Sequence, residues 1–216
     1  MIIPFNPSEI FERNPKAKTS VDGDVVIIDD YYLHYEDIYD MLMNTYAPMW
    51  KADKEHSRNF IDYYDCRPCI SIAHADIKYE FDIIAEVYHE QGRIEKLGSN
   101  EKEYNYFKWK QNISPQTHQM YPHRDTQYAS IIYIDKVCSG GTAFYEGITG
   151  HFANNEGRDL FYDVSTMIKK VIPAKPNRHI IFRGDKFHGG YIEDHNKYVN
   201  DWRINECIFY KSVGEN

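Results

Sequence analysis

The stretch Tyr121-Pro-His-Arg-Asp125, which continues into Gln127-Tyr-Ala-Ser-Ile-Ile-Tyr-Ile-Asp135, decides how the fold of this chain is interpreted. His123 and Asp125 are two residues apart, so on a β-strand their side chains point to the same face. An imidazole and a carboxylate on one face supply two ligands of a metal site. A second imidazole would complete the two-His, one-carboxylate set that binds non-haem Fe(II) and leaves coordination positions open. The stretch therefore predicts a metal centre, provided that a third ligand lies elsewhere.

A second His-x-Asp pair, His74-Ala-Asp76, competes with the first. The chain contains ten His, and roughly one such pair is expected by chance. Asp76 stands where the N-cap of a helix belongs, because its side chain can accept the free amides of a first helical turn. Apolar residues then recur at helical spacing, at Ile77, Phe81, Ile84, Val87 and Tyr88. The sequence therefore favours a helix cap for Asp76 and leaves the metal site to His123 and Asp125.

Composition limits the classes of function. The 216 residues carry a net charge of −8 and the pI is about 5.7, which argues against a non-specific nucleic-acid binder. The chain contains no run of 18 apolar residues, so the sequence predicts no membrane span. The N-terminus lacks a basic region followed by an apolar stretch, so we expect a cytoplasmic protein without a signal peptide.

The four cysteines are Cys66, Cys69, Cys138 and Cys207. The first two have the spacing of a redox motif, but no βαβ pattern precedes them and no second Cys pair is present for zinc. The sequence favours a plain loop for Cys66 and Cys69, with a redox function as the alternative.

Hydrophobic periodicity divides the chain into two parts. Residues 1–20 are expected to be an irregular arm, 24–29 a strand, 33–46 an amphipathic helix, 49–68 a loop, 70–74 a short strand and 77–88 a helix. After Gly98 the pattern changes to short strands separated by Gly, Asp and Asn, at 104–110, 129–134, 142–145, 170–175, 179–182, 187–192 and 201–210, with a short helix around 159–169. This pattern predicts a mainly β (α+β) protein with a β-sandwich or barrel rather than βαβ units, all in one domain over 1–216.

Two downstream residues extend the candidate site. His188 follows a turn in Arg183-Gly-Asp-Lys-Phe-His-Gly-Gly190, and the two Gly let the backbone bend. Arg203 begins a strand in which Arg203, Asn205 and Cys207 alternate with Ile204, Glu206 and Ile208, so Arg203 points into a barrel, where a buried Arg needs an anion. Metal-free alternatives are a hydrogen-bonded His123–Asp125 pair, a turn His at 188, a surface ion pair of Arg203 with Asp201 or Glu206, and a core position for Tyr133.

The order of these features resembles the Fe(II)/2-oxoglutarate-dependent dioxygenases, over about residues 104–211. The pattern Pro-His-x-Asp, then an apolar strand, Gly-Gly-Thr-Ala-Phe-Tyr145, His and Arg, is most similar to the prolyl-hydroxylase-like branch and its uncharacterised bacterial and phage members. The resemblance implies a double-stranded β-helix (jelly-roll) core, buttressed by a strand and helices from residues 1–100.

The resemblance also implies roles for individual residues. His123, Asp125 and His188 would be the iron ligands and would act in catalysis through the iron. Arg203 would pair with the distal carboxylate of 2-oxoglutarate, Tyr133 would hydrogen-bond to the same carboxylate, and Asn205 would support it. Arg203 follows His188 by fifteen residues, a longer gap than in many prolyl hydroxylases, which we interpret as a hairpin insertion at 193–200.

The implied activity is hydroxylation of an amino acid, a peptide or protein, or a small molecule. It would consume 2-oxoglutarate and O₂, release succinate and CO₂, and use ascorbate as a reductant. Since Asp125 occupies a ligand position, hydroxylation is favoured over halogenation. Residues 49–68 and 151–169 are expected to flank the mouth of the site. The alternatives are a cupin-like metalloprotein acting as an isomerase or hydrolase, and a non-catalytic jelly-roll binding module.

Overall fold

The computed structural model describes residues 10–46, 64–67, 71–73, 78–97, 101–109, 122–148, 165–194, 196–201 and 203–214. Its strands are β1 (Lys18–Asp22), β2 (Val25–Asp29), β3 (Tyr64–Arg67), β4 (Ser71–Ala73), β5 (Arg93–Lys96), β6 (Glu101–Trp109), β7 (Tyr128–Tyr133), β8 (Gly141–Tyr145), β9 (Ile168–Pro173), β10 (His179–Arg183), β11 (His188–Tyr191) and β12 (Arg203–Val213). The helices are α2 (Tyr35–Asp40), a π-helical turn η1 (Met41–Tyr46), α4 (Lys78–Tyr88), the 3₁₀ turn η5 (Ser165–Met167) and α5 (Lys197–Asn200).

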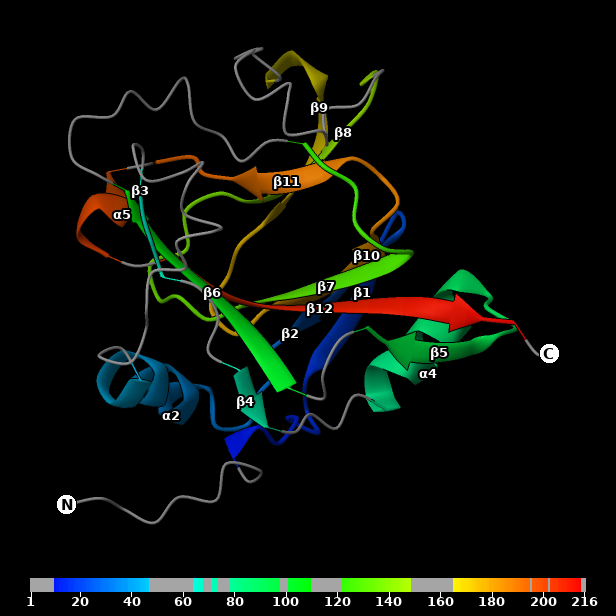
Figure 1. Cartoon of the computed structure of the whole chain (residues 1–216), viewed down its shortest axis with the longest axis horizontal. Helices are drawn as coiled ribbons and strands as arrows, with labels where there is room; N and C mark the ends of the chain where they lie inside the picture. Colours follow the sequence, from blue (N-terminus) through cyan, green and yellow to red (C-terminus); the bar gives the residue numbers. More distant parts are fainter. Residues whose placement is uncertain are drawn as a thin grey trace.

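The strands form two antiparallel sheets. The major sheet has the order β1-β2-β10-β7-β12-β6-β3, with β4 also paired to β6 and β5 to β12, and the minor sheet has the order β11-β8-β9. From β7 onward the chain crosses between the sheets: β7, β10 and β12 belong to the major sheet, and β8, β9 and β11 to the minor one (Figure 1). This crossing makes a double-stranded β-helix, as the family resemblance implied.

The space between the sheets is filled by alternate residues of their strands. On β7, Ala129 and Tyr133 pack inward with Phe144 and Phe182, whereas Tyr128 and Ile132 belong to a second cluster on the other face of the sheet. Period-two alternation is the reason, because neighbouring side chains of a strand point to opposite faces. The sequence pattern thus separates residues that line the barrel from residues that hold the helices.

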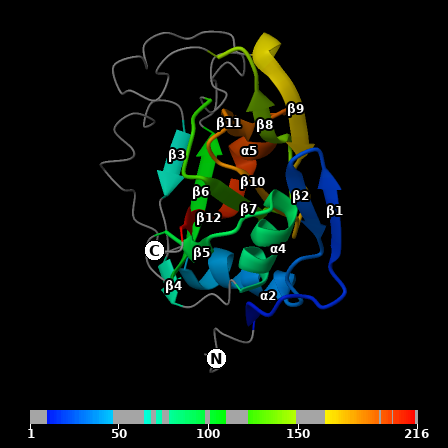
Figure 2. The ribbon, with the colours of Figure 1, turned by 90° about the vertical axis from the view of Figure 1, so that its right-hand side faces the viewer.

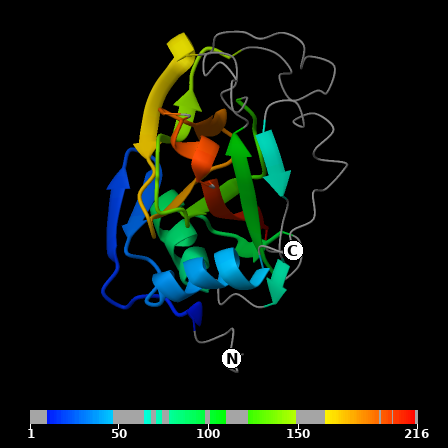
Figure 3. The same cartoon turned by 90° about the vertical axis from the view of Figure 1, so that its left-hand side faces the viewer.

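The helices α2 and α4 cover the outer face of the major sheet. Ile38 of α2 and Ile84 of α4 are fully buried in the same cluster as Ile204 and Ile208 of β12. Figures 2 and 3 show the same layering from two sides, with α2 and α4 on one side of the major sheet and β8, β9 and β11 on the other. The first part of the chain therefore buttresses the barrel. No described helix has the length and apolar character needed to cross a membrane.

The structure corrects several expectations. The irregular arm expected over 1–20 is wrong at its end, because residues 18–22 form β1. All five side chains of β1 are exposed, so no apolar pattern marks this strand, which pairs with β2 across a turn where Gly23 has a φ of 63°. Residues 64–67 form β3 within the expected loop, and β5 was not anticipated. The helix expected over 33–46 turns π-helical at Met41. Of the helix expected around 159–169, the structure describes only η5, and β9 begins at Ile168.

The segment at 193–200 is also different from its prediction. Instead of a hairpin it contains one helical turn, α5, which buries Tyr198 completely. A hairpin would need two strands to pair, whereas this segment is held by contacts of Tyr198 with the loop after β7. The predicted cap at His74-Ala-Asp76 and the residue Cys69 lie outside the described residues, and Cys66 lies on β3.

Candidate metal centre

Three of the predicted site residues converge on one point. Ligand atoms of His123, Asp125 and His188 all lie within 4.8 Å of one another. Asp125 Oδ2 lies 3.0 Å from His188 Nε2 and 3.7 Å from His123 Nε2. Two imidazole nitrogens and one carboxylate oxygen at these separations can bind one divalent ion on a single face. Among the described residues, this is the group of three His, Cys, Asp or Glu side chains whose ligand atoms lie this close together.

Backbone pairing places the two histidines together. His123 and His188 form an antiparallel bridge, with N–H···O distances of 2.8 Å from His123 to His188 and 3.0 Å in return. Residues that exchange both hydrogen bonds lie directly opposite each other, so their side chains project on the same side. Their ring centroids are 4.6 Å apart. The third ligand is held in the same way, because the amide of Asp125 donates to the carbonyl of Gly184 at 2.8 Å.

The surroundings of His188 select the nitrogen that faces the site. Its Nδ1 lies 2.8 Å from the carbonyl oxygen of Lys186. A carbonyl only accepts hydrogen bonds, so Nδ1 carries the proton and the lone pair of Nε2 is left for a metal. The edge of Phe182 packs against the ring at a centroid distance of 4.7 Å, and His188 is only 2% exposed. His188 is therefore fixed in both position and tautomer.

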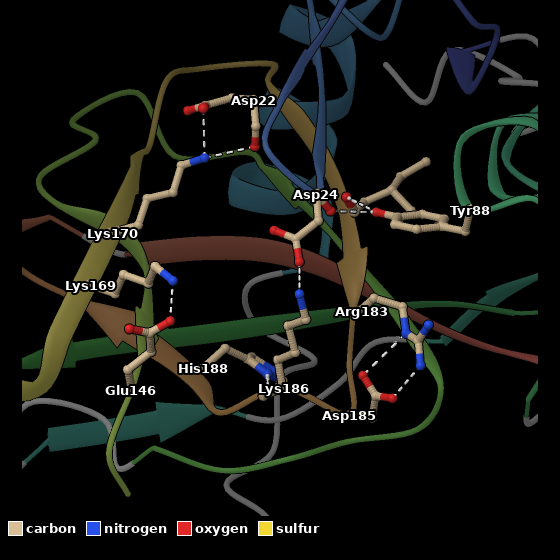
Figure 4. Close-up of polar contacts among 11 residues, drawn as sticks. Asp22, Asp24, Tyr88, Glu146, Lys169, Lys170, Arg183, Asp185, Lys186 and His188 are labelled. Atoms are coloured by element: carbon tan, nitrogen blue, oxygen red, sulfur yellow. Dashed lines mark hydrogen bonds and ion pairs between the residues drawn. The ribbon is translucent and has the colours of Figure 1, made fainter.

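The turn that supplies this carbonyl is tied to the N-terminal hairpin. The Lys186 side chain forms an ion pair with Asp24, and the carbonyl of Asp24 accepts a hydrogen bond from Tyr88 Oη at 2.8 Å (Figure 4). Lys170 of β9 reaches the neighbouring Asp22 at 2.7 Å. The turn between β1 and β2 thus contacts the turn before His188, although exposed ion pairs contribute little stability by themselves.

The charge state of Asp125 suits a metal ligand. Partial burial raises the pKa of its carboxyl, but the adjacent imidazole rings of His123 and His188 outweigh burial and hold the pKa well below its usual value. The group is therefore a carboxylate at neutral pH. Two imidazoles and one carboxylate match the donor set that Fe(II) takes in non-haem sites, so the residues present fit the metal that the sequence predicted.

The predicted co-substrate residues line the inner wall of the barrel. Arg203 is 3% exposed, and its Nη1 donates to Asn205 Oδ1 at 3.1 Å. Asn205 lies opposite Tyr133 in the register of β12 and β7. The buried position of Arg203 rules out the surface ion pair that was its alternative, and Glu206 is on the other face, where it accepts from Tyr32 Oη at 2.8 Å.

Sequence reasoning missed one polar residue of this wall. Thr142 on β8 is fully buried, and its Oγ1 lies 2.7 Å from the hydroxyl of Tyr133. The signal was available in the pattern of Gly141-Thr-Ala-Phe144, because Thr142 and Phe144 share a face of the strand and Phe144 is apolar core. The Tyr133 hydroxyl thus has a structural partner, and its contact with a co-substrate remains a prediction.

Gly184 is a position where an added methyl group should disturb the metal ligands. A Cβ there would lie 2.4 Å from the carbonyl oxygen of Thr126, next to Asp125. We expect Gly184→Ala to cost about 1–3 kcal/mol of stability through overpacking, and to weaken metal binding about tenfold by shifting Asp125. Thermal unfolding and calorimetric titration with Mn(II) measure the two effects.

The matched control for this substitution is Gly214→Ala, where nothing lies within 4 Å of the added carbon. It should leave both quantities unchanged. If Gly184→Ala unfolds at lower temperature but binds Mn(II) as tightly as the unmodified chain, Gly184 contributes to stability and does not position Asp125.

Comparison with known proteins gives structural similarity only. No protein-family model matches the chain, and a search of curated proteins found none similar to it. Among solved structures, a 2OG-Fe(II) oxygenase family oxidoreductase from Burkholderia pseudomallei superposes with a TM-score of 0.50 at 9% identity, covering 87% of this chain and 84% of that one. HygX from Streptomyces hygroscopicus, solved with nickel and 2-oxoglutarate, gives 0.44 at 10% identity, with coverage of 88% and 83%.

The epimerase SnoN of nogalamycin biosynthesis gives a TM-score of 0.43 at 11% identity, covering 88% of this chain and 79% of that one. Only the first of these TM-scores reaches 0.50, and at 9% identity this match shows a similar fold and not a shared activity. The chain therefore has a double-stranded β-helix fold similar to that of the Burkholderia oxidoreductase, and a His-x-Asp pair and a later His meet within it.

Proposed function

We propose that this chain is an Fe(II)- and 2-oxoglutarate-dependent oxygenase of the prolyl-hydroxylase-like branch. It hydroxylates an amino acid, a peptide or protein residue, or a small molecule, and releases succinate and CO₂. We also propose that it acts in the cytoplasm and does not act on nucleic acid. The observation that carries the proposal is the His123–Asp125–His188 group in a barrel whose inner wall also holds the buried cation Arg203.

Each residue type suits its proposed task. His123, Asp125 and His188 would hold the iron on one face, and bound iron supplies the place where the 2-oxo acid and dioxygen react. The planar guanidinium of Arg203 can bind a carboxylate through two parallel hydrogen bonds. The rings of Phe144 and Phe182 beside His188 exclude water from that side of the site, which strengthens the electrostatic attraction of an anionic co-substrate.

Succinate formation tests the proposal. Purified chain is loaded with Fe(II) and incubated in air with 2-oxoglutarate and ascorbate, and candidate amino acids, peptides and metabolites are added in separate reactions. We expect succinate that depends on both Fe(II) and 2-oxoglutarate, and a product heavier by one oxygen atom with the correct substrate. Omitting ascorbate should shorten the active period, since it serves only as a reductant.

Two outcomes would point to other functions. Tight metal binding without 2-oxoglutarate binding favours a cupin-like isomerase or hydrolase. Binding of both metal and 2-oxoglutarate with no turnover against a broad set of substrates favours a non-catalytic binding module.

A further inference from the structure

Asp135 is a buried acid close to the candidate co-substrate residues. It follows β7, two residues after Tyr133, and is 1% exposed. Its amide lies 3.2 Å from the carbonyl oxygen of Ile204, the neighbour of Arg203 on β12. The carboxylate therefore lies where β7 ends beside the start of β12. A carboxylate at such depth is costly unless a cation or hydrogen bonds compensate it.

Hydrogen bonds fix this carboxylate on one side only. Oδ2 accepts from the amide of Cys138 at 2.9 Å and from the hydroxyl of Tyr198 at 2.8 Å. Oδ1 is equally buried and has no hydrogen-bond partner among the described residues. A proton could therefore attach to Oδ1 without breaking either hydrogen bond of Oδ2.

The segment that contains α5 holds the loop around Asp135 in place through hydrogen bonds. The hydroxyl of Tyr198 also accepts from the amide of Ser139 at 2.8 Å, and Ser139 Oγ accepts from the amide of Asp194 at 2.9 Å. These contacts join the loop after β7 to the chain between His188 and Arg203. Because of them, Asp135 cannot turn outward to water when its surroundings change.

The charge of Arg203 acts on this carboxyl. Burial raises the pKa of Asp135, and the nearby guanidinium of Arg203 opposes that rise. Lys136 points outward to Glu36, at 2.5 Å. Among the described residues, the other titratable groups near Asp135 come from β7, the following loop, α2 and α5. Burial raises the pKa of each, so they stay neutral near pH 7: Tyr133, Cys138, Tyr35, Tyr39 and Tyr198.

We propose that Asp135 is an internal counter-anion of Arg203, and that it takes up a proton when the distal carboxylate of a dicarboxylic 2-oxo acid binds the same guanidinium. The inference rests on the proposed function. The bound carboxylate adds a second negative charge beside the guanidinium that already acts on Asp135. Two carboxylates close together in a low-dielectric site raise each other's pKa. A proton on Oδ1 removes one of the two negative charges.

Asp135 would thus affect the preference of the site between dicarboxylic and monocarboxylic 2-oxo acids. It opposes the binding of a dicarboxylic 2-oxo acid by the free energy of its own protonation, and it has no such effect on a monocarboxylic one. Its contribution depends on pH, because protonation becomes harder as the pH rises. The affinity for 2-oxoglutarate should therefore fall with increasing pH, by at most about tenfold per unit above the pKa of Asp135.

Proton uptake can be measured directly on the metal-loaded chain. The protein is first saturated with Mn(II), so that protons displaced from the metal ligands do not contribute, and is then titrated with 2-oxoglutarate in buffers of different ionisation enthalpy at one pH. We expect uptake approaching about one proton per co-substrate bound. Titration with 2-oxobutanoate, which lacks the distal carboxylate, should show none.

The substitution Asp135→Asn preserves shape and removes the charge. We expect it to abolish proton uptake, flatten the pH dependence, and tighten 2-oxoglutarate binding about three- to tenfold at pH 8, the range expected for relief of one like-charge interaction. Binding of 2-oxobutanoate should not change. A purely structural function of Asp135 would instead weaken both ligands. The control is Glu193→Gln, which removes an exposed charge from the same segment and should behave like the unmodified chain.

The possible failures can be told apart. If the unmodified chain binds 2-oxoglutarate without taking up protons, or if Asp135→Asn keeps the uptake, the inference about Asp135 is wrong and the proposed function stands. If the Mn(II)-loaded chain does not bind 2-oxoglutarate at all, the proposed function itself is wrong. Should Asp135→Asn not fold, the proton uptake of the unmodified chain still decides the question.

Discussion

Replacing Asp125 by alanine is expected to abolish Fe(II) binding and succinate formation. Asp125 is the anionic member of the ligand group, and its Oδ2 lies within 3.7 Å of both His123 Nε2 and His188 Nε2. Without it, two neutral imidazoles must hold a divalent cation alone. We expect the metal affinity to fall by more than about a hundredfold, beyond the loss caused by removing a hydrogen-bond partner of a ligand. Titration with Fe(II) under anaerobic conditions, followed by a succinate assay, measures both effects.

The control for Asp125→Ala is Asp185→Ala. Asp185 is an acid in the nearby turn before His188, but its carboxylate pairs with Arg183 and is about half exposed. Its removal should change neither metal affinity nor turnover. The assignment of Asp125 is wrong if its alanine variant, with an unchanged circular dichroism spectrum, binds Fe(II) as tightly as Asp185→Ala does.

Replacing Arg203 by alanine is expected to have the second largest effect, on the co-substrate alone. Two charge-assisted hydrogen bonds to a carboxylate are worth about 3–4 kcal/mol together, so the Kd for 2-oxoglutarate should rise roughly 10²- to 10³-fold. Metal affinity should stay the same, because Arg203 lies at the Tyr133 end of β7, away from the ligand group. Calorimetric titration of the Mn(II)-loaded variant with 2-oxoglutarate measures the change.

Two further variants sharpen the test of Arg203. Arg203→Lys keeps the charge but loses the fork-shaped donor pair, so it should give an intermediate affinity. Arg183→Ala removes a partly exposed Arg that pairs with Asp185 and should have no effect. Unaltered 2-oxoglutarate binding in a folded Arg203→Ala variant would remove Arg203 from the site.

The parts of this fold that were predictable from sequence are those with a strong period. The alternation in β12 predicted that Arg203 points into the barrel, and the structure buries Arg203 on the strand that pairs with β7, where Tyr133 packs inward. The Pro-His-x-Asp pattern and the His before two Gly identified the group that meets at the site. In each case a residue's neighbours in sequence determine the direction of its side chain.

The parts that could not be predicted depend on contacts between distant segments. The strand β1 has five exposed side chains and exists through its pairing with β2. The helical turn α5 is held by Tyr198, whose partners Asp135 and Ser139 lie about sixty residues earlier. Gly184 has no room for a side chain because the carbonyl of Thr126 lies next to it in the folded chain. None of these contacts leaves a periodic pattern in the chain.

The bridge between His123 and His188 bears on when the entropy of assembling the candidate metal site is lost. Their amides and carbonyls satisfy one another without any ion, so the entropy of bringing two ligands together is lost during folding and not when metal arrives. We therefore expect the barrel to stay folded when a chelator removes a bound divalent ion, and to bind the ion again without refolding.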